Sequence, residues 1–450
     1  MTTATLIPPS LAPLTPERSR SSQRIAVVGS GISGLSAAWL LSRRHRVTLF
    51  EAERRLGGHT HTVDVRVDGQ VFPVDTGFLV FNHQTYPQLT ALFDHLGVET
   101  LASEMSFAVS LREPALEWAG SNLATVFGQK RNLVRPEFWR MLAEIVRFNR
   151  ESMAWLKTHG EEAQTLRQFL EQGRYSAAFA DWYLLPMAAA IWSCPAAQML
   201  DYPLATFVRF CNNHGLLQIL DRPQWRTVAG GGREYVKKLA AGLRDIRLAT
   251  PVRQILRTRS DMLVVHDQGV EEFDQVVLAC HSDQALALLG RDARPAEAEA
   301  LRALRYQMNH AVLHTDRRLL PRDRSLWSAW NYLAQGGRSD SRPVSVSYLL
   351  NRLQPLPTDE PVVVTLNPIE PPAAEKTIAQ FDYAHPIFDR AAIAAQRQIA
   401  ALSGLDRVWF AGAWNGYGFH EDGLKSGLAV AQAMGCHAPW QEQVAEEQVA

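Results

Sequence analysis

The sequence is short of cysteine, carries no excess of either charge and contains no long apolar run. Its four cysteines, Cys194, Cys211, Cys280 and Cys436, lie far apart and form no CxxC pair. This spacing argues against a metal module and favours reduced thiols in a cytoplasmic protein. No stretch of about 18 apolar residues occurs, so no transmembrane helix is expected. Lys plus Arg and Asp plus Glu number 46 each, which argues against nucleic acid as a partner.

The length and the first residues bound the organisation of the chain. At 450 residues it exceeds one ordinary hydrophobic core, so two or more lobes are expected. Residues 1–23 are rich in Pro, Ser and Thr and lack the apolar run of a signal peptide. They predict a mobile arm.

A β-α-β unit with a glycine motif follows the arm. The run RIAVVG at 24–29 reads as a buried parallel strand, the following segment as a helix, and HRVTLFEA as a second strand. Gly29 permits a tight turn, Gly31 lets the backbone approach a pyrophosphate, and Gly34 brings the helix against the strand. Glu51 ends the second strand, where a carboxylate can bind both adenosine ribose hydroxyls and disfavours a 2′-phosphate. These features together predict a dinucleotide site.

The residues after Glu51 resemble the flavin-containing amine oxidase superfamily. Its members share a glutamate, then R-x-G-G-R, then a D-x-G stretch, and this chain has EAERRLGGHTHTV and VDTGFLVF. The resemblance implies FAD, with Arg55 at the cofactor and Gly77–Phe78 beside the isoalloxazine. His59 stands where the family usually has its second arginine. Further matches are TPVRQIL, DQVVLAC and FAGAWNGYGFHEDGLKSGLAVA, although Ala413 replaces the acid that commonly follows F-A-G.

The resemblance covers about residues 24–437 and implies both a fold and a cofactor site. We expect an α/β protein with a Rossmann-type (GR2-like) FAD-binding domain and an inserted α+β substrate domain of antiparallel sheet and helices. The expected FAD-binding domain is discontinuous (24–82, 225–288 and 400–437), the substrate or cap domain spans 83–224 and 289–399, and a tail follows at 438–450. The residues expected at FAD are Gly29, Gly31, Ser33, Gly34, Glu51, Ala52, Arg55, Gly57, Gly58, His59, Thr76, Gly77, Phe78, Val252, Ala279, Gly412, Ala413, Asp422, Gly423 and Leu424. A helix beginning at 423–425 is expected at the pyrimidine edge of the flavin.

Three longer strings resemble a bacterial branch encoded beside cyclopropane-fatty-acid synthase-like methyltransferases. These strings are IWSCPAAQMLDYP, FCNNHGLLQILDRPQWRTVAGGGREYV and GYGFHEDGL. The association favours a lipid acyl chain as substrate and such a methyltransferase as a partner.

Few titratable groups are needed for oxidation at a flavin, so the candidate catalytic set is small. Tyr417, His420 and Glu421 are placed nearest the substrate face. Tyr417 could instead pack in the core. His420 and Glu421 could relay a proton, or could simply fix the expected loop 414–423 by hydrogen bonds. Asn309 and His310 stand where the family has its lysine, which argues against an amine oxidase. His59 and His61 have no third ligand at useful spacing, so no metal is expected.

Three functions stay open. The first is a lipid-modifying flavoenzyme of desaturase, saturase or isomerase type that transfers hydride to flavin N5. The second is an oxidase of amines or another small soluble compound, and the third is an FAD-bearing, non-catalytic partner of a lipid methyltransferase. The helix expected at 137–156 mixes aromatic and arginine side chains. It could contact the inner membrane face as a peripheral anchor, but a cap helix with solvated arginines is favoured.

Overall fold

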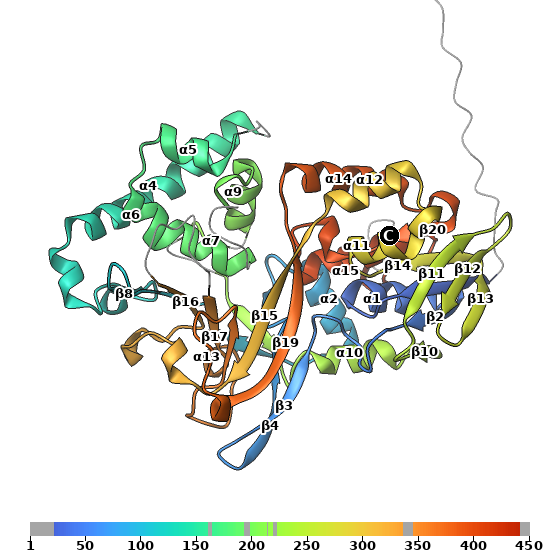
Figure 1. Ribbon diagram of the computed structural model, residues 1–450, viewed down its shortest axis with the longest axis horizontal. Coiled ribbons are helices and arrows are strands. Elements are labelled where there is room, and N and C mark those ends of the chain that lie inside the picture. The colour runs from blue at the N-terminus through green and yellow to red at the C-terminus, as the bar shows by residue number, and fades with distance from the viewer. Residues whose placement is uncertain are drawn as a thin grey trace, which may run out of the picture.

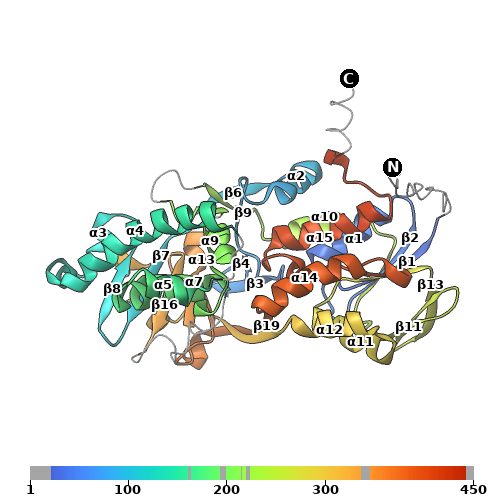
Figure 2. The same cartoon turned by 90° about the horizontal axis from the view of Figure 1, so that it is seen from above.

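The computed structural model describes residues 22–160, 164–192, 199–213, 215–218, 223–335 and 345–441. The expected arm lies almost wholly outside these ranges, as do Cys194 and the tail beyond residue 441. Two parts lie end to end (Figures 1 and 2): one is built on a parallel sheet, and the other on a larger, mainly antiparallel sheet with a group of helices.

The first part contains the predicted parallel sheet. Its five strands follow the order β10–β2–β1–β14–β20, and every neighbouring pair is parallel. Their bounds are β1 Arg24–Val28, β2 Arg46–Phe50, β10 Asp245–Arg247, β14 Gln275–Leu278 and β20 Val408–Phe410. Helices α1 (Ile32–Leu41) and α15 (His420–Ala433) pack against each other beside this sheet (Figure 1). The short apolar strands are buried on both faces, as expected for a doubly covered parallel sheet.

Smaller elements complete this part. Strands β11 (Val252–Arg257), β12 (Met262–His266) and β13 (Gly269–Phe273) form an antiparallel sheet. The surrounding helices are α2 Pro87–Leu96, α10 Arg233–Ala240, α11 Ser282–Leu289, α12 Pro295–Ala303 and α14 Arg390–Leu402. The sequence near 283–305 reads as one helix but forms two, because the chain turns at Gly290 and a new helix starts at Pro295, a residue that suits the first turn of a helix.

The second part is built on a seven-stranded sheet in the order β19–β15–β18–β17–β16–β7–β8. Its neighbours are antiparallel except β16 and β7, which are parallel. The strand bounds are β7 Phe107–Leu111, β8 Leu116–Ala119, β15 Tyr306–His314, β16 Trp330–Ala334, β17 Ser345–Leu349, β18 Val363–Leu366 and β19 Thr377–Pro386. The helices beside it are α3 Leu123–Val126, α4 Pro136–His159, α5 Leu166–Gln172, α6 Ala177–Phe179, α7 Leu185–Trp192 and α9 Leu204–Asn213.

Two short sheets join the parts. One pairs β3 (Thr62–Val67) with β4 (Gln70–Asp75), and the other has the order β5–β9–β6, with bounds Phe81–Asn82, Trp225–Val228 and Thr100–Ser103. The sequence from about 90 to 222 reads as mostly helical, but it also holds strands β6, β7 and β8. These strands are only four or five residues long, too short for alternation to stand out in the sequence. No described helix is long and apolar enough to cross a bilayer.

Candidate functional site

The glycine motif lies between β1 and α1, and its three glycines differ in surroundings. Gly29 has a φ of +104°, and a Cβ there would lie 2.7 Å from the carbonyl oxygen of Ala279. A Cβ on Gly34 would lie 1.9 Å from the carbonyl oxygen of Gly29. Gly31, in contrast, has a φ of −61° and no atom within 4 Å of such a Cβ. Gly29 and Gly34 are therefore required by packing, whereas Gly31 borders open space at the N-terminus of α1.

Helices α1 and α15 both begin beside the glycine turn. A Cβ on Gly423 of α15 would lie 2.7 Å from Cγ2 of Ile32, and one on Gly427 would lie 2.3 Å from the carbonyl oxygen of Ser33. This contact, possible only for glycine, brings the N-termini of α1 and α15 together with their free N–H groups. Helix α15 begins at His420 and not at 423–425 as expected, so the amides of its first turn belong to residues 420–423.

Glu51 follows β2, and its carboxylate faces the glycine turn. Its Oε2 accepts a hydrogen bond from the Ser30 backbone N–H at 2.9 Å, and its Oε1 accepts one from the Glu53 N–H at 2.9 Å. Its backbone N–H donates to the carbonyl of Arg247 at 2.9 Å, and its carbonyl accepts from Thr250 N–H. The backbone of Glu51 is thus fixed by β10 and the segment that follows it, and the carboxylate by the N–H groups of Ser30 and Glu53.

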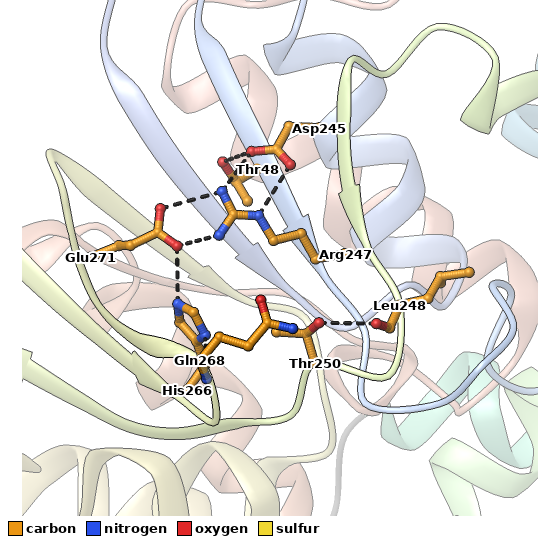
Figure 3. A network of polar contacts seen from close by, with 8 residues as sticks. All are labelled: Thr48, Asp245, Arg247, Leu248, Thr250, His266, Gln268 and Glu271. Carbon is orange, nitrogen blue, oxygen red and sulfur yellow. Dashed lines mark hydrogen bonds and ion pairs between the residues drawn. The ribbon is translucent and has the colours of Figure 1, made fainter.

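A charged network fixes that neighbouring segment (Figure 3). Arg247 forms an ion pair with Asp245 at 3.0 Å and a second one with Glu271 of β13. Thr48 donates to Asp245 at 2.8 Å, and His266 contacts Glu271 at 2.9 Å. Because Arg247 holds the pKa of Glu271 below its usual value, the pair stays ionised near neutral pH. The network joins the small antiparallel sheet, where Val252 begins β11, to the edge of the parallel sheet beside Glu51.

The Arg55–His59 turn lies against the glycine turn. The Arg55 guanidinium donates to the Gly58 carbonyl at 2.8 Å, and the Gly57 N–H donates to the Ser30 carbonyl at 3.0 Å. A Cβ on Gly58 would lie 3.1 Å from Cα of Gly31. The Nε2 atom of His59 is buried without a hydrogen-bond partner. A buried polar atom of this kind needs a partner, and one supplied by a ligand would satisfy it.

The remaining residues expected at FAD surround the same place. Thr76 and Phe78 pair by backbone hydrogen bonds with His61 and His59, so a Cβ on Gly77 would lie 2.1 Å from the His59 carbonyl oxygen. Ala279 packs against Gly34, and Ala413 lies beside Gly423. The Gly412 N–H donates a hydrogen bond to the Ser426 hydroxyl. Ser33 and Leu424 are buried, whereas Ala52 is exposed.

The residues present fit FAD. Open space at Gly31 suits a pyrophosphate, the converging helix N-termini favour negative charge, and the unpartnered His59 Nε2 offers a hydrogen bond. Glu51 is placed for the ribose hydroxyls.

His420 is held on two sides at the first residue of α15. Its Nε2 lies 2.6 Å from the Tyr235 hydroxyl, which in turn lies 2.5 Å from Oγ1 of Thr60. Phe78 stacks on the imidazole with ring centroids 3.9 Å apart. Burial lowers the pKa of His420 to about 3, so the ring is neutral near pH 7. The hydrogen-bonded chain can run in either direction, and the two directions correspond to the two neutral imidazole tautomers.

Glu421 and Asp422 make structural contacts. Glu421 accepts hydrogen bonds from the backbone N–H groups of Gln88 and Leu89 at 3.0 and 2.9 Å, and so caps α2. Asp422 accepts hydrogen bonds from the N–H groups of Tyr417 and Phe419 at 3.0 and 3.1 Å. Of the two readings that the sequence left open for Glu421, these contacts favour the one in which it fixes the loop.

The aromatic side chains of the loop point to the helical part. Phe419 stacks on Phe210 of α9, with centroids 4.7 Å apart, and Tyr417 packs edge-on against the same ring at 6.2 Å. Phe210 belongs to a buried cluster that includes Phe148, Phe179 and Trp192. The segment 414–419 before α15 is therefore in contact with the aromatic core of the helices.

Spacing in the sequence does not reveal a group of histidines that surrounds His59. The His59 ring lies 5.7 Å from His281, 5.6 Å from His385 and 5.3 Å from Tyr383, which come from segments more than 200 residues away. Asn309, at the position expected for the family lysine, lies 2.7 Å from Nδ1 of His385. Within the described residues, no group of three His, Cys, Asp or Glu side chains could hold a metal ion.

Acidification should destabilise the folded protein steeply. Burial lowers the pKa of seven described histidines below 6.5: His45, His59, His61, His281, His314, His385 and His420. Below pH 6.5 the unfolded chain binds protons that the folded chain does not, so the free energy of unfolding falls with pH until the folded pKa values are reached. Asp75 and Asp422 act oppositely, because burial raises their pKa to about 6, but they are two groups against seven.

Thermal unfolding measured from pH 7 to pH 4.5 should therefore show a falling Tm. Each unit of pKa shift corresponds to ~1.4 kcal/mol, so the free energy of unfolding should fall by several kcal/mol over this range. His314 is remote from the glycine turn and has a pKa lowered to about 4. His314→Gln should lower by about one the number of protons taken up on unfolding, and so make the free energy of unfolding less dependent on pH. A Tm independent of pH in this range would contradict the prediction.

Comparison with known proteins identifies related chains. The model of the flavin-containing amine oxidoreductase family matches residues 32–366, more than half of the chain. The carotenoid phi-ring synthase of Chlorobaculum tepidum is 30% identical over 167 residues, which are 37% of this chain and 24% of that protein. Protoporphyrinogen oxidase 2 of Arabidopsis thaliana is 35% identical over 94 residues, 21% of this chain and 17% of that one. The matches thus span about a quarter or less of these relatives.

Solved structures share the fold over nearly their whole length. A CLA-producing fatty acid isomerase from P. acnes superposes with a TM-score of 0.64 at 15% identity and covers 91% of this chain and 98% of its own. Cyclohexylamine oxidase from Brevibacterium oxydans IH-35A gives a TM-score of 0.62 at 17% identity and covers 92% and 100%. At these identities the likeness establishes the fold alone, and it agrees with the α/β arrangement predicted from the sequence.

Proposed function

The chain belongs to the family of flavin-containing amine oxidoreductases. From this premise we propose that it is an FAD-dependent oxidoreductase whose substrate is hydrophobic, specifically a fatty acyl chain. Bound FAD supplies the hydride acceptor. The residues of the chain bind FAD, exclude water and position the acyl chain. The reaction class is that of a desaturase, saturase or double-bond isomerase.

The observation that carries the proposal is the stacking of Phe419 on Phe210 at 4.7 Å. Phe419 directly precedes α15, whose N-terminus meets that of α1 at the glycine turn. The aromatic core of the helices therefore extends to the edge of the FAD site. An apolar wall of this kind favours a substrate without charge near its reacting carbon and keeps water from it.

The charged groups near the loop argue against an amine substrate. An ammonium group needs a carboxylate or another acceptor when it leaves water. The carboxylates of Glu421 and Asp422 are occupied by backbone N–H groups of α2 and of the loop. His59, His385 and His420 are neutral near pH 7 because burial lowers their pKa. The fold is shared with a fatty acid isomerase as well as with an amine oxidase, so it is compatible with an acyl substrate but does not select one.

Anaerobic mixing of the FAD-loaded enzyme with a panel of compounds tests the proposal. Saturated, unsaturated and methyl-branched fatty acids and their phospholipids should bleach the flavin or yield a shifted double bond, detected by gas chromatography of the recovered chains. Putrescine and cyclohexylamine should leave the flavin oxidised. Turnover of these amines with peroxide release would overturn the proposal. If no compound is turned over and a lipid methyltransferase co-purifies stably, the protein would instead be a non-catalytic partner of that enzyme.

A further inference from the structure

Exposed apolar side chains gather at the end of the molecule far from the parallel sheet. Of the eleven large hydrophobic side chains exposed among the described residues, five lie between residues 123 and 146. Their exposed fractions are 78% for Leu123, 48% for Leu133, 82% for Val134, 49% for Trp139 and 55% for Val146. The other six are spread over the chain from Val71 to Leu405. Such a concentration on one part of a surface marks an interaction site.

The surface of α4, η1 and α3 that carries these five side chains is here called the α4 face. Trp139, Ala143 and Val146 follow at i, i+4 and i+7 along α4 and so share a side of the helix, opposite the buried side of Phe138 and Met141. The Trp139 indole N–H donates to the carbonyl of Leu133 at 2.9 Å, and its ring lies 5.0 Å from Phe127. Segment η1 (Lys130–Val134) and the end of helix α3 therefore lie beside the start of α4.

The α4 face carries positive charge. Between residues 121 and 146 the sequence has four basic side chains (Lys130, Arg131, Arg135 and Arg140) and two acidic side chains (Glu137 and Glu144), an excess of two positive charges. Lys130, Arg131 and Arg140 are exposed. Helix α4 and α3 lie at one extreme of the molecule, and β1 and β2 lie near the other (Figure 2). Arg140 pairs with Glu144 at 3.2 Å, which leaves Lys130, Arg131 and Arg135 against Glu137 on this face.

We infer that the α4 face docks on an anionic lipid surface. Exposed Leu and Val side chains beside a half-exposed tryptophan, bordered by Lys and Arg, match the composition of helices that lie in the membrane interface. The basic residues supply attraction to anionic headgroups, each contributing a several-fold increase in affinity. A protein partner or a second copy would need acidic groups opposite the same residues, and this face offers two fewer acidic than basic groups. The inference goes beyond the substrate assignment and does not depend on it.

Co-sedimentation of the FAD-loaded full chain with vesicles tests the inference without substrate. Vesicles of phosphatidylcholine with about a third phosphatidylglycerol should bind the protein, and vesicles of pure phosphatidylcholine should bind it at least about 30-fold more weakly. The double variant Val134→Glu/Trp139→Glu should lower the affinity for anionic vesicles at least about tenfold. The double variant Lys130→Gln/Arg131→Gln should lower it by up to about 30-fold. The matched control Val270→Glu/Met308→Glu changes two side chains that are 58% and 63% exposed elsewhere and should bind as the natural chain does.

Absence of binding to anionic vesicles would overturn the inference, as would equal binding to both vesicle types. Equal loss in the control and the Val134→Glu/Trp139→Glu variant would overturn the location. A dimer in sedimentation velocity that only the latter variant abolishes would assign the face to a second copy instead. FAD content and turnover in detergent-dispersed substrate should be unchanged in all these variants, which separates this test from that of the proposed function.

Discussion

Gly31→Leu should yield a folded protein that has lost FAD. The space beside Gly31 holds no protein atom within 4 Å of a Cβ, and the residue has a φ of −61° that any side chain adopts. A leucine there would fill the place expected for the pyrophosphate without disturbing the protein. FAD affinity should fall by about 100-fold or more, which corresponds to at least about 2.7 kcal/mol. Flavin absorbance of the protein after gel filtration measures the loss.

The stability of FAD-free protein provides the control. Gly31→Leu should lower it by at most about 1 kcal/mol, the usual cost of a poor N-cap residue. Gly34→Ala, with a Cβ 1.9 Å from the Gly29 carbonyl oxygen, should lower it by about 3 kcal/mol or more, because backbone must move. A Gly31→Leu protein that retains yellow colour at full occupancy would show that the pyrophosphate lies elsewhere.

The second large effect is expected at His420. His420→Ala should slow substrate-dependent reduction of the flavin by about 10²–10⁴-fold while FAD stays bound, the usual range for loss of a general acid or base. The physical reason is the chain from Thr60 through Tyr235 to Nε2 of His420, which can reverse direction and so move a proton to or from the ring without charging it. Stopped-flow reduction with a bound-FAD count measures both quantities.

Two further variants separate a relay from a structural role. Tyr235→Phe keeps the buried ring but removes the hydroxyl, so reduction should slow by about tenfold or more and its pH profile should shift. Glu421→Gln, one residue from His420, weakens the cap of α2 and should lower stability by about 1–3 kcal/mol with the reduction rate unchanged. An unchanged rate in His420→Ala at full FAD occupancy would remove His420 from the mechanism.

Patterns within short stretches of the sequence were enough to predict the first strands of the parallel sheet and the glycine turn. Strand β1, the glycines and Glu51 lie within 28 residues, so that spacing alone constrains their arrangement in space. The start of α15 was misplaced by three residues, because Gly423 reads as a helix opening in sequence although its role is the contact with Ile32 of α1. Strand and helix identity follow from local pattern, whereas a glycine required by a distant backbone looks the same as one required by a turn.

The groups around His59 could not have been predicted from one sequence. His281 follows β14, and Tyr383 and His385 lie on β19, and only the pairing of β15 with β19 next to the parallel sheet brings them together. The role of Glu421 was equally hidden, since its partners are the backbone amides of Gln88 and Leu89, more than 300 residues earlier. Long-range contacts of this kind leave no periodic signal in the chain.

The order of strands in the parallel sheet sets when the cofactor can be captured during biosynthesis. Strands β1 and β2 leave the ribosome first, but their neighbour β14 begins at Gln275 and the edge strand β20 at Val408. Contacts so distant in sequence form slowly, and until they form the apolar strands Arg24–Val28 and Arg46–Phe50 stay open to aggregation and to chaperones. Helix α15, which meets α1 at the glycine turn, is synthesised later still. A nascent or truncated chain that ends before this helix therefore has no completed FAD site, so flavin retention reports on synthesis of nearly the full length.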